Sequence, residues 1–277
     1  MFKKRINNLR EKLNETNTGV AIITDDDSIY YYTGYYDYLH MEFWRPTILI
    51  VPKDDKSLLI TPTVDMALAD DETKIDLLEA WNDGVGNEWR EHIPKMLNGK
   101  NKIGIELNHM PPLVRNYIDS IIDKNKIVNI TPIISEMRMI KSDEELQLAR
   151  YAGQVGVAMM TAGKNTIADG VPEYEVAIAS SNAGTRKASE ILNKHYKGTR
   201  MSPLIHFLHI MSSGEHITTT HHRASTRVMK KGEPAYLCFC GMTNFHRFKL
   251  GFDRLFFINE VLEKSHEKAY EVAIESQ

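Results

Sequence analysis

The sequence predicts two domains, an α/β domain over residues 1–138 and an α+β domain over residues 139–277. Three observations support this prediction. Short apolar runs alternate with amphipathic segments as far as Met137, which is typical of a layered domain with a mixed or parallel sheet. Two long helical segments then follow one another. Strand-like runs dominate the remainder, up to a final helical segment.

The amino-terminal domain is expected to begin with an amphipathic helix, because apolar residues recur at helical spacing through residues 2–15. An apolar run at 19–25 predicts a buried strand. The aromatic run at 29–35 predicts another strand, since tyrosine favours extended backbone. Two apolar runs separated by the charged turn at 53–56 predict an antiparallel hairpin. Further helices are expected at 64–70, 87–97 and 111–123, and further strands at 74–81, 102–107 and 127–130.

The carboxy-terminal domain is expected to open at a capping box. Ser142 and Glu145 have the Ser-x-x-Glu spacing in which each side chain accepts a hydrogen bond from the other residue's backbone N–H, and a long helical segment follows. A second helix is expected to start at or near Pro172, because proline is favoured in the first turn. Strands are then expected at 204–211, 234–240 and 248–258, with a final helix at 263–277.

The composition is that of a globular protein and argues against some classes of partner. Hydrophobic residues make up 42% and charged residues 26%, which predicts a packed core. The formal net charge of −3 gives no support for a nucleic-acid or anionic-membrane partner. No apolar run is long enough to span a bilayer, and the amino terminus lacks the apolar core of a secretory signal. We therefore expect a cytoplasmic protein that binds neither nucleic acid nor membrane, with Cys238 and Cys240 as buried reduced thiols.

The stretch from Ser212 to Phe257 carries the densest group of chemically versatile residues. Six of the eleven histidines lie between His206 and His246, and His221 and His222 are adjacent. Histidine is the side chain most readily poised between acid and base near neutral pH, so the group indicates a site of chemistry. A chance cluster of surface histidines is the alternative, which the residue types alone leave open.

Several motifs, in their order and spacing, resemble those of the creatinase/prolidase family. They are YYTGY at 31–35, the capping-box helix from Ser142, GVPEYEVAIA at 170–179 and the segment from Gly214 to Arg254. The resemblance implies that the first domain is the family's substrate-cap domain, and that the second is the first half of its pita-bread catalytic domain. The second half of that catalytic domain is absent from this sequence.

The resemblance also implies a metal-independent site. Metal-dependent members of the family hold two ions with two aspartates from this half and a histidine and two glutamates from the other. The first aspartate corresponds to Cys238, or to Cys240 when counted back from the FDR sequence at 252–254, and the second corresponds to Gly251. Glycine offers no ligand, and a lone thiolate favours softer metals than a carboxylate does. No cofactor is therefore expected.

Metal-independent members, the creatinase-like and ectoine-hydrolase-like ones, use a histidine as general acid and base and a carboxylate that holds the cationic part of the substrate. The resemblance implies these roles for His221 and for Asp253, which directly precedes Arg254. Without a metal, water must be activated by a base of near-neutral pKa, which fits histidine. His222 is the alternative base, because only one of two adjacent side chains faces a pocket, and we prefer His221. For Asp253 the alternative is a structural pair with Arg254.

In the first domain, Trp44 and Arg45 stand where family members carry an aromatic residue and an arginine that reach into the site of a partner subunit. The resemblance therefore implies a homodimer. An arginine fork binds a carboxylate through two parallel hydrogen bonds, which suits a substrate with an acid group. The alternative is a surface arginine stacked on Trp44 or Tyr38.

The favoured interpretation is a metal-independent hydrolase of an amide or amidine C–N bond in a small zwitterionic metabolite. The acid group of that substrate would meet Arg45, and its cationic group would meet Asp253. A metallopeptidase that cleaves Xaa-Pro dipeptides is one alternative. A truncated, non-catalytic remnant that binds a ligand or dimerises is another, because half of the expected catalytic domain is missing from the sequence.

Overall fold

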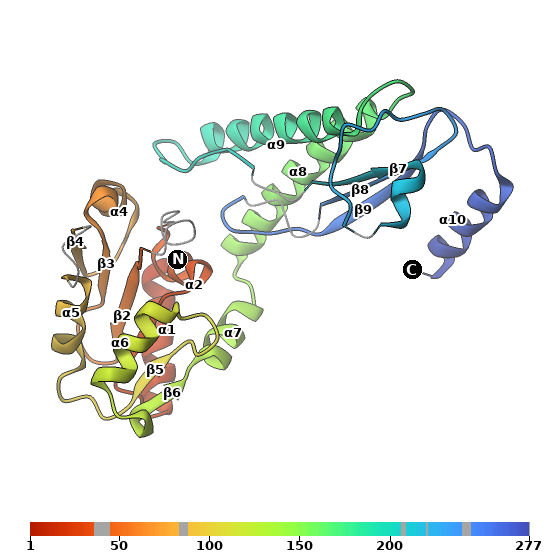
Figure 1. Ribbon diagram of the computed structural model, residues 1–277. Helices are drawn as coiled ribbons and strands as arrows, with labels where there is room; N and C mark the ends of the chain where they lie inside the picture. Colours follow the sequence, from red (N-terminus) through yellow and green to blue (C-terminus); the bar gives the residue numbers. More distant parts are fainter. Residues whose placement is uncertain (36–44, 83–87, 206–208, 220, 240–244, 277) are drawn as a thin grey trace. The chain divides into compact units, whose positions relative to one another are not determined.

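The computed structural model describes residues 1–35, 45–82, 88–205, 209–219, 221–239 and 245–276 (Figure 1). The chain divides into two compact units, Met1–Lys141 and Ser142–Gln277. The division lies close to the boundary expected between residues 138 and 139. No helix in the described part of the chain has both the length and the apolar character that crossing a membrane requires.

The first unit is built on a six-stranded mixed sheet. Its strand order is β4-β3-β2-β1-β5-β6, and only the β1–β2 and β2–β3 pairs are antiparallel. The expected hairpin is therefore present as β2 and β3. The strands are β1 Val20–Ile23, β2 Ile48–Pro52, β3 Leu58–Pro62, β4 Leu77–Trp81, β5 Ile103–Ile105 and β6 Ile127–Asn129. The helices are α1 Phe2–Glu15, α2 Asp26–Thr33, α4 Met66–Glu72, α5 Glu88–Leu97, α6 Pro112–Ile121 and α7 Thr131–Met139, with 3-10 turns at Thr63–Asp65 and Lys124–Lys126.

Successive side chains of the central strands enter two different cores, because a strand alternates its faces. Val20 and Ile22 pack with residues of α5 and α6 on one side of the sheet. Ala21 and Ile23 pack with residues of α1, α2 and α7 on the other. Both faces of the sheet are thus covered by helices, and the expectation of a layered α/β domain is confirmed.

The strand predicted for the aromatic run at 29–35 is wrong, because this run lies mostly in helix α2. Asp25 caps this helix, accepting a hydrogen bond from the Ser28 backbone N–H at 2.9 Å. Gly34 ends it with a left-handed φ of 82°, which glycine adopts without strain. Tyr32 is buried in the core beside α1. The two end signals and this burial outweigh the modest preference of tyrosine for extended backbone.

The second unit consists of two long helices, a three-stranded antiparallel sheet in the order β7-β8-β9, and a last helix. The predicted capping box is present: the Ser142 N–H donates to Glu145 Oε2 at 2.8 Å, and the Glu145 N–H donates to Ser142 Oγ at 3.3 Å. The elements are α8 Asp143–Thr166, α9 Glu173–His195, β7 His209–Ser213, the 3-10 helix η3 Gly214–Thr218, β8 Pro234–Phe239, β9 Phe252–Phe257 and α10 Lys264–Ser276.

The two faces of the small sheet have different surroundings. Met211, Leu237 and Phe239 point into the core formed with α8 and α9, which lie against this side of the sheet (Figure 1). Tyr236 and Asp253 belong to the alternate set of strand positions and therefore occupy the opposite face. Of the candidate residues from the sequence analysis, this second face carries Asp253.

Candidate active site

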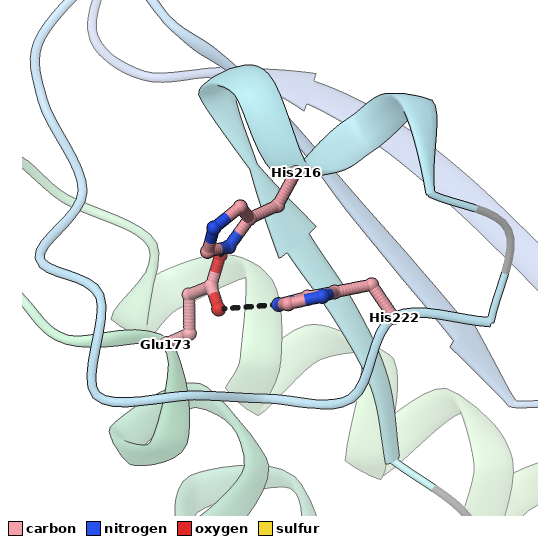
Figure 2. A group of neighbouring side chains, drawn as sticks. All are labelled: Glu173, His216 and His222. Atoms are coloured by element: carbon pink, nitrogen blue, oxygen red, sulfur yellow. Dashed lines mark hydrogen bonds and ion pairs between the residues drawn. The ribbon is translucent and has the colours of Figure 1, made fainter.

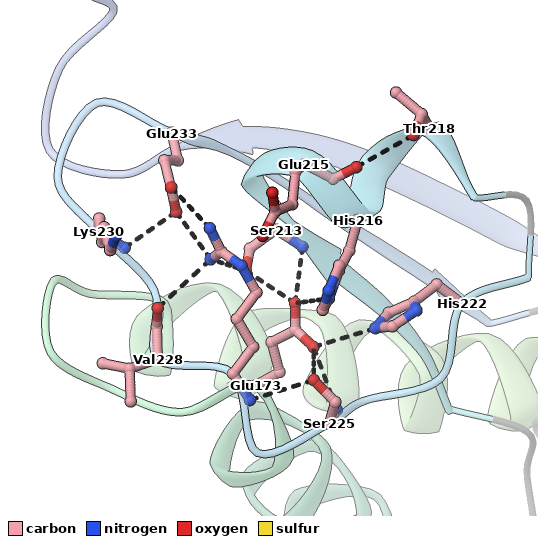
Figure 3. A network of polar contacts seen from close by, with 11 residues as sticks. Glu173, Ser213, Glu215, His216, Thr218, His222, Ser225, Val228, Lys230 and Glu233 are labelled. Carbon is pink, nitrogen blue, oxygen red and sulfur yellow. Dashed lines mark hydrogen bonds and ion pairs between the residues drawn. The ribbon is translucent and has the colours of Figure 1, made fainter.

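Glu173 is the first residue of α9 and the centre of a polar network in the second unit (Figure 3). Its side chain is fully buried. Ser213 donates to Oε1 from its backbone N–H at 2.8 Å and from its hydroxyl at 2.7 Å. Ser225 donates to Oε2 from its N–H at 3.1 Å and from its hydroxyl at 2.6 Å. The carboxylate therefore joins the start of α9 to the end of β7 and to the loop at Ser225, both distant in the sequence.

These donors fix the charge state of Glu173. Burial alone would raise the pKa of a carboxyl group, but the hydrogen bonds from Ser225, Ser213 and His222 outweigh it and hold the pKa of Glu173 below its ordinary value. The amino terminus of a helix also favours an anion, because its backbone N–H groups point outward. Glu173 is accordingly a buried anion with a full set of donors.

Two histidines face this carboxylate (Figure 2). His222 Nε2 lies 3.3 Å from Oε2, and because a carboxylate can only accept, this nitrogen is the donor. His216 Nδ1 lies 3.8 Å from Oε1, beyond hydrogen-bond distance. The two imidazole rings are 4.2 Å apart between centroids. His222 is thus held in the network beneath the sheet, on the side of α9.

An ion pair between Arg227 and Glu233 is connected to the network through Ser213. Arg227 binds Glu233 through two hydrogen bonds of 2.7 and 2.8 Å, and it donates a third to Ser213 Oγ at 2.9 Å. This bidentate contact raises the pKa of Arg227 and lowers that of Glu233. Gly214 lies against the pair with φ of 52°, where a Cβ atom would come within 2.4 Å of the guanidinium. The pair therefore fixes the turn that follows β7.

On the open face, Asp253 of β9 lies opposite Cys238 of β8. The Tyr236 hydroxyl donates to Asp253 Oδ2 at 2.9 Å. Partial burial, followed by this contact, raises the pKa of Tyr236, so the phenol stays protonated. Asp253 is exposed, and a pocket of about 540 Å³ lies over it. Leu255 and Phe257 of β9 and His266 and Tyr270 of α10 also line that pocket.

The candidate residues from the sequence are distributed over different places. His222 joins Glu173, whereas the adjacent His221 is exposed, with a left-handed φ of 63° and no hydrogen-bond or ion-pair partner among the described residues. No ion pair joins the side chains of Asp253 and Arg254 in the part of the chain that the structure describes; the guanidinium instead donates to the backbone carbonyl of Asp253. The structural pair considered for Asp253 is therefore not formed.

The remaining candidates lie elsewhere. Arg45 is a partly buried residue of the first unit, and Trp44 lies outside the described residues. Cys238 is buried, as expected, and Cys240 lies outside the described residues.

Sequence reasoning did not identify Glu173 or His216 as members of the site. Glu173 had one usable signal, an acidic residue placed directly after Pro172 at an expected helix start. His216 lies within the histidine-rich stretch and had no signal of its own. Their partners are 40 to 52 residues away from Glu173 in the sequence, so only the fold brings them together.

The positions of the family's metal-binding aspartates do not fit a carboxylate-bridged pair of ions. Cys238 is a buried thiol and Gly251 has no side chain, so neither supplies an anionic oxygen. Asp253 is the nearby carboxylate, and its Oδ2 accepts a hydrogen bond from Tyr236. No step through a metal pair is therefore derived for these residues.

Comparison with known proteins identifies relatives of this chain. The family model described as the creatinase/prolidase N-terminal domain matches residues 5–140. Creatinase from Bacillus sp. (strain B-0618) is 24% identical over 274 residues, covering 97% of this chain and 63% of the creatinase. Agropine synthesis cyclase from Rhizobium rhizogenes is 28% identical over 177 residues, covering 63% of this chain and 44% of the relative. The chain thus spans less than two thirds of the length of these relatives.

Solved structures share the fold at low sequence identity. The prolidase from Pyrococcus horikoshii OT3 superposes with a TM-score of 0.77 at 17% identity, over 98% of this chain and 70% of that one. Aminopeptidase P from E. coli superposes with a TM-score of 0.74 at 17% identity, over 100% of this chain and 67% of that one. The α/β unit and the pita-bread-like α+β unit therefore have the fold of these known proteins, and residues 5–140 form a creatinase/prolidase N-terminal domain.

Proposed function

We propose that this chain is a hydrolase that cleaves an amide or amidine C–N bond in a small zwitterionic metabolite without a metal, with His221 as general acid and base. The observation that carries the proposal is the different environment of the two adjacent histidines. His222 is held by Glu173, while His221 is exposed and has no partner among the described residues. A base must be accessible to water and substrate, and His221 meets that requirement.

The course of the backbone supports the same assignment. Met211 donates its N–H to the carbonyl of His222 at 3.2 Å, and Ile210 forms a bridge with Arg223, so this segment runs beside β7. His222 lies on the helix side, as Met211 does. His221 precedes this segment with a left-handed φ of 63° and is exposed, so its side chain is outside the contacts that hold His222.

The chemistry needs two proton transfers. Neutral His221 takes a proton from water as the water oxygen bonds to the amide or amidine carbon, and the imidazolium then gives that proton to the leaving nitrogen as the C–N bond breaks. The Asp253 carboxylate, oriented by Tyr236, holds the cationic end of the substrate. Arg45, supplied by the second subunit of a homodimer, binds the acid group.

The test is a substrate panel in the presence of EDTA, using creatine, N-acyl amino acids and Xaa-Pro dipeptides. We expect turnover of an amidine or amide zwitterion, and a loss of about 10²–10⁴-fold for His221→Ala, the usual contribution of a general acid–base group. His195→Ala is the matched control, an exposed histidine at the end of α9 that lies in the same unit but outside the pocket over Asp253, and it should leave turnover unchanged. Full turnover by His221→Ala would refute the proposal.

Two other outcomes identify the competing functions. Turnover of Xaa-Pro dipeptides that disappears with EDTA and returns with a divalent metal would indicate a metallopeptidase. Binding of panel members without turnover of any would indicate a non-catalytic binding protein.

A further inference from the structure

We infer that Glu173, His216 and His222 form a binding site for one divalent transition-metal ion of the zinc type (Figure 2). One ligand atom from each residue lies within 4.8 Å of the others. The site is separate from Cys238 and Gly251, the positions that correspond to the family's metal ligands, and it is independent of the proposed hydrolysis.

The distances are of the size that a shared cation requires. His222 Nε2 and His216 Nδ1 lie 3.3 and 3.8 Å from the Glu173 oxygens. Hydrogen bonds between nitrogen and oxygen have lengths of about 2.7–3.2 Å, so the first contact is long and the second is too long. Ligands at about 2.0–2.2 Å from a tetrahedral zinc ion are separated from one another by roughly 3.3–3.5 Å. The two imidazole nitrogens face different oxygens of Glu173, at 3.3 and 3.8 Å, which is close to that range.

His216 supplies a second, independent observation. Its Nδ1 is buried and has no hydrogen-bond partner in the described part of the chain. Buried polar atoms are nearly always paired, and an exception indicates a missing partner. The nitrogen is directed at the Glu173 carboxylate (Figure 2). A metal ion between the imidazole and the carboxylate would be bound by the lone pair of His216 Nδ1.

The surroundings of Glu173 have the character of a second coordination shell. The Ser213 and Ser225 hydroxyls donate to its two oxygens at 2.7 and 2.6 Å. Arg227 in turn holds Ser213 (Figure 3). Ligating carboxylates are commonly oriented in this way, and loss of such a partner weakens metal affinity by about 10–100-fold.

The ligand set selects the kind of ion. Two imidazoles and one carboxylate form a well-known zinc site, and the same donors accept Co²⁺ and Ni²⁺. Mg²⁺ and Ca²⁺ prefer all-oxygen surroundings and are not expected to bind. Because Glu173 begins α9, His216 lies in η3 and His222 follows in the next loop, the ion would link three segments of the second unit.

Titration calorimetry with Zn²⁺, on the full chain after EDTA treatment and dialysis, tests the site. We expect one equivalent of Zn²⁺ to bind. Ser225→Ala removes a residue that only orients a ligand, so it should weaken the affinity by about 10–100-fold. His216→Ala and His222→Ala each remove a ligand and should weaken the affinity by more than that. His221→Ala is the matched control, adjacent in sequence but outside the ligand set, and it should bind as the wild type does.

Absence of Zn²⁺ binding by the wild type would overturn the inference. Binding that survives in His216→Ala but is lost in His221→Ala would overturn it equally, because the ion would then occupy a different site. If an alanine variant fails to fold, His216→Gln and His222→Gln replace it. In the wild type, the visible spectrum of bound Co²⁺ should show a nitrogen- and oxygen-ligated ion of low coordination number, and an octahedral spectrum would contradict the geometry.

Discussion

Glu106 in the first unit and Glu173 in the second are both buried, but their pKa values are shifted in opposite directions. Glu106 follows β5, and Glu173 begins α9; their side chains are both almost inaccessible to solvent. Glu106 accepts a hydrogen bond from the Ser28 hydroxyl at 2.8 Å, while its Oε2 has no hydrogen-bond partner in the described residues. Burial, with a smaller contribution from the charge of Asp25, raises its pKa to about 7.

Among the described residues, Ser213, Ser225 and His222 all donate to Glu173, whereas Ser28 is the side chain that donates to Glu106, and the pKa of Glu173 is lowered. The comparison teaches that the number of donors, and not the depth of burial, decides whether a buried carboxyl group is charged. It also separates a group that is built to remain an anion from one that changes charge near neutral pH.

The largest effect is expected from Glu173→Ala. Removing this carboxylate leaves two backbone N–H groups and two hydroxyls without their acceptor, and we expect the free energy of unfolding to fall by about 3–5 kcal/mol, as when one partner of a buried charged network is lost. Urea denaturation measures it. Glu175→Ala, in the same helical turn, is the control and should change stability by less than about 1 kcal/mol. Equal effects would show that the donors are unimportant.

The second prediction concerns pH and Glu106. Its pKa is about 7 in the folded state against 4.5 ordinarily, so the folded protein binds more protons between these values. Stability should therefore be fully present below pH 4.5 and decline as pH rises to about 7, by a total on the order of 3 kcal/mol. Glu106→Gln should remove this decline, as measured by unfolding at pH 5 and pH 8. Glu79→Gln, on an exposed strand position, should retain it.

The contribution of Glu173 has the opposite sign. Because its folded pKa is lowered, the stability it supplies is present above its ordinary value of 4.5 and is lost as the pH falls below that value. Acid titration of the wild type should therefore destabilise the second unit. Glu106 is protonated at acid pH, so its burial should not destabilise the first unit under these conditions.

A smaller effect is expected from Ser225→Ala, which removes one hydroxyl donor at 2.6 Å and leaves the backbone donors in place. A hydrogen bond to a charged group contributes about 1.5–3 kcal/mol. The pKa of Glu173 should rise towards its ordinary value, so the loss of stability on acidification should be smaller and should end at higher pH. An unchanged acid transition in this variant would mean that the hydroxyl does not hold the charge.

Local patterns were sufficient to predict most of the fold. The capping box at Ser142, the hairpin of β2 and β3 and the start of α9 beside Pro172 depend on neighbouring residues, so the sequence displays them. The strand predicted at 29–35 was wrong because the aromatic composition was given more weight than Asp25 and Gly34, the residues that cap the two ends of the helix.

The candidate site was less predictable, because its contacts are long-range. His222 and Glu173 are 49 residues apart, and Ser213 and Glu173 are 40 apart. The resemblance to the family indicated His221 and Asp253, whose roles remain predictions. It gave no indication of the carboxylate that holds His222. Only the fold shows which of two adjacent histidines is bound to a buried anion.

In the proposed site, the contact with Glu173 gives His222 a structural role, and His221 is the catalytic base. The most direct measurement compares His221→Ala with His222→Ala, recording turnover of the best panel substrate with EDTA and the urea midpoint of each variant. We expect His221→Ala to lose turnover with an unchanged midpoint, and His222→Ala to lower the midpoint while the folded fraction still turns over substrate. The reverse pattern, with inactivity confined to His222→Ala, would contradict it.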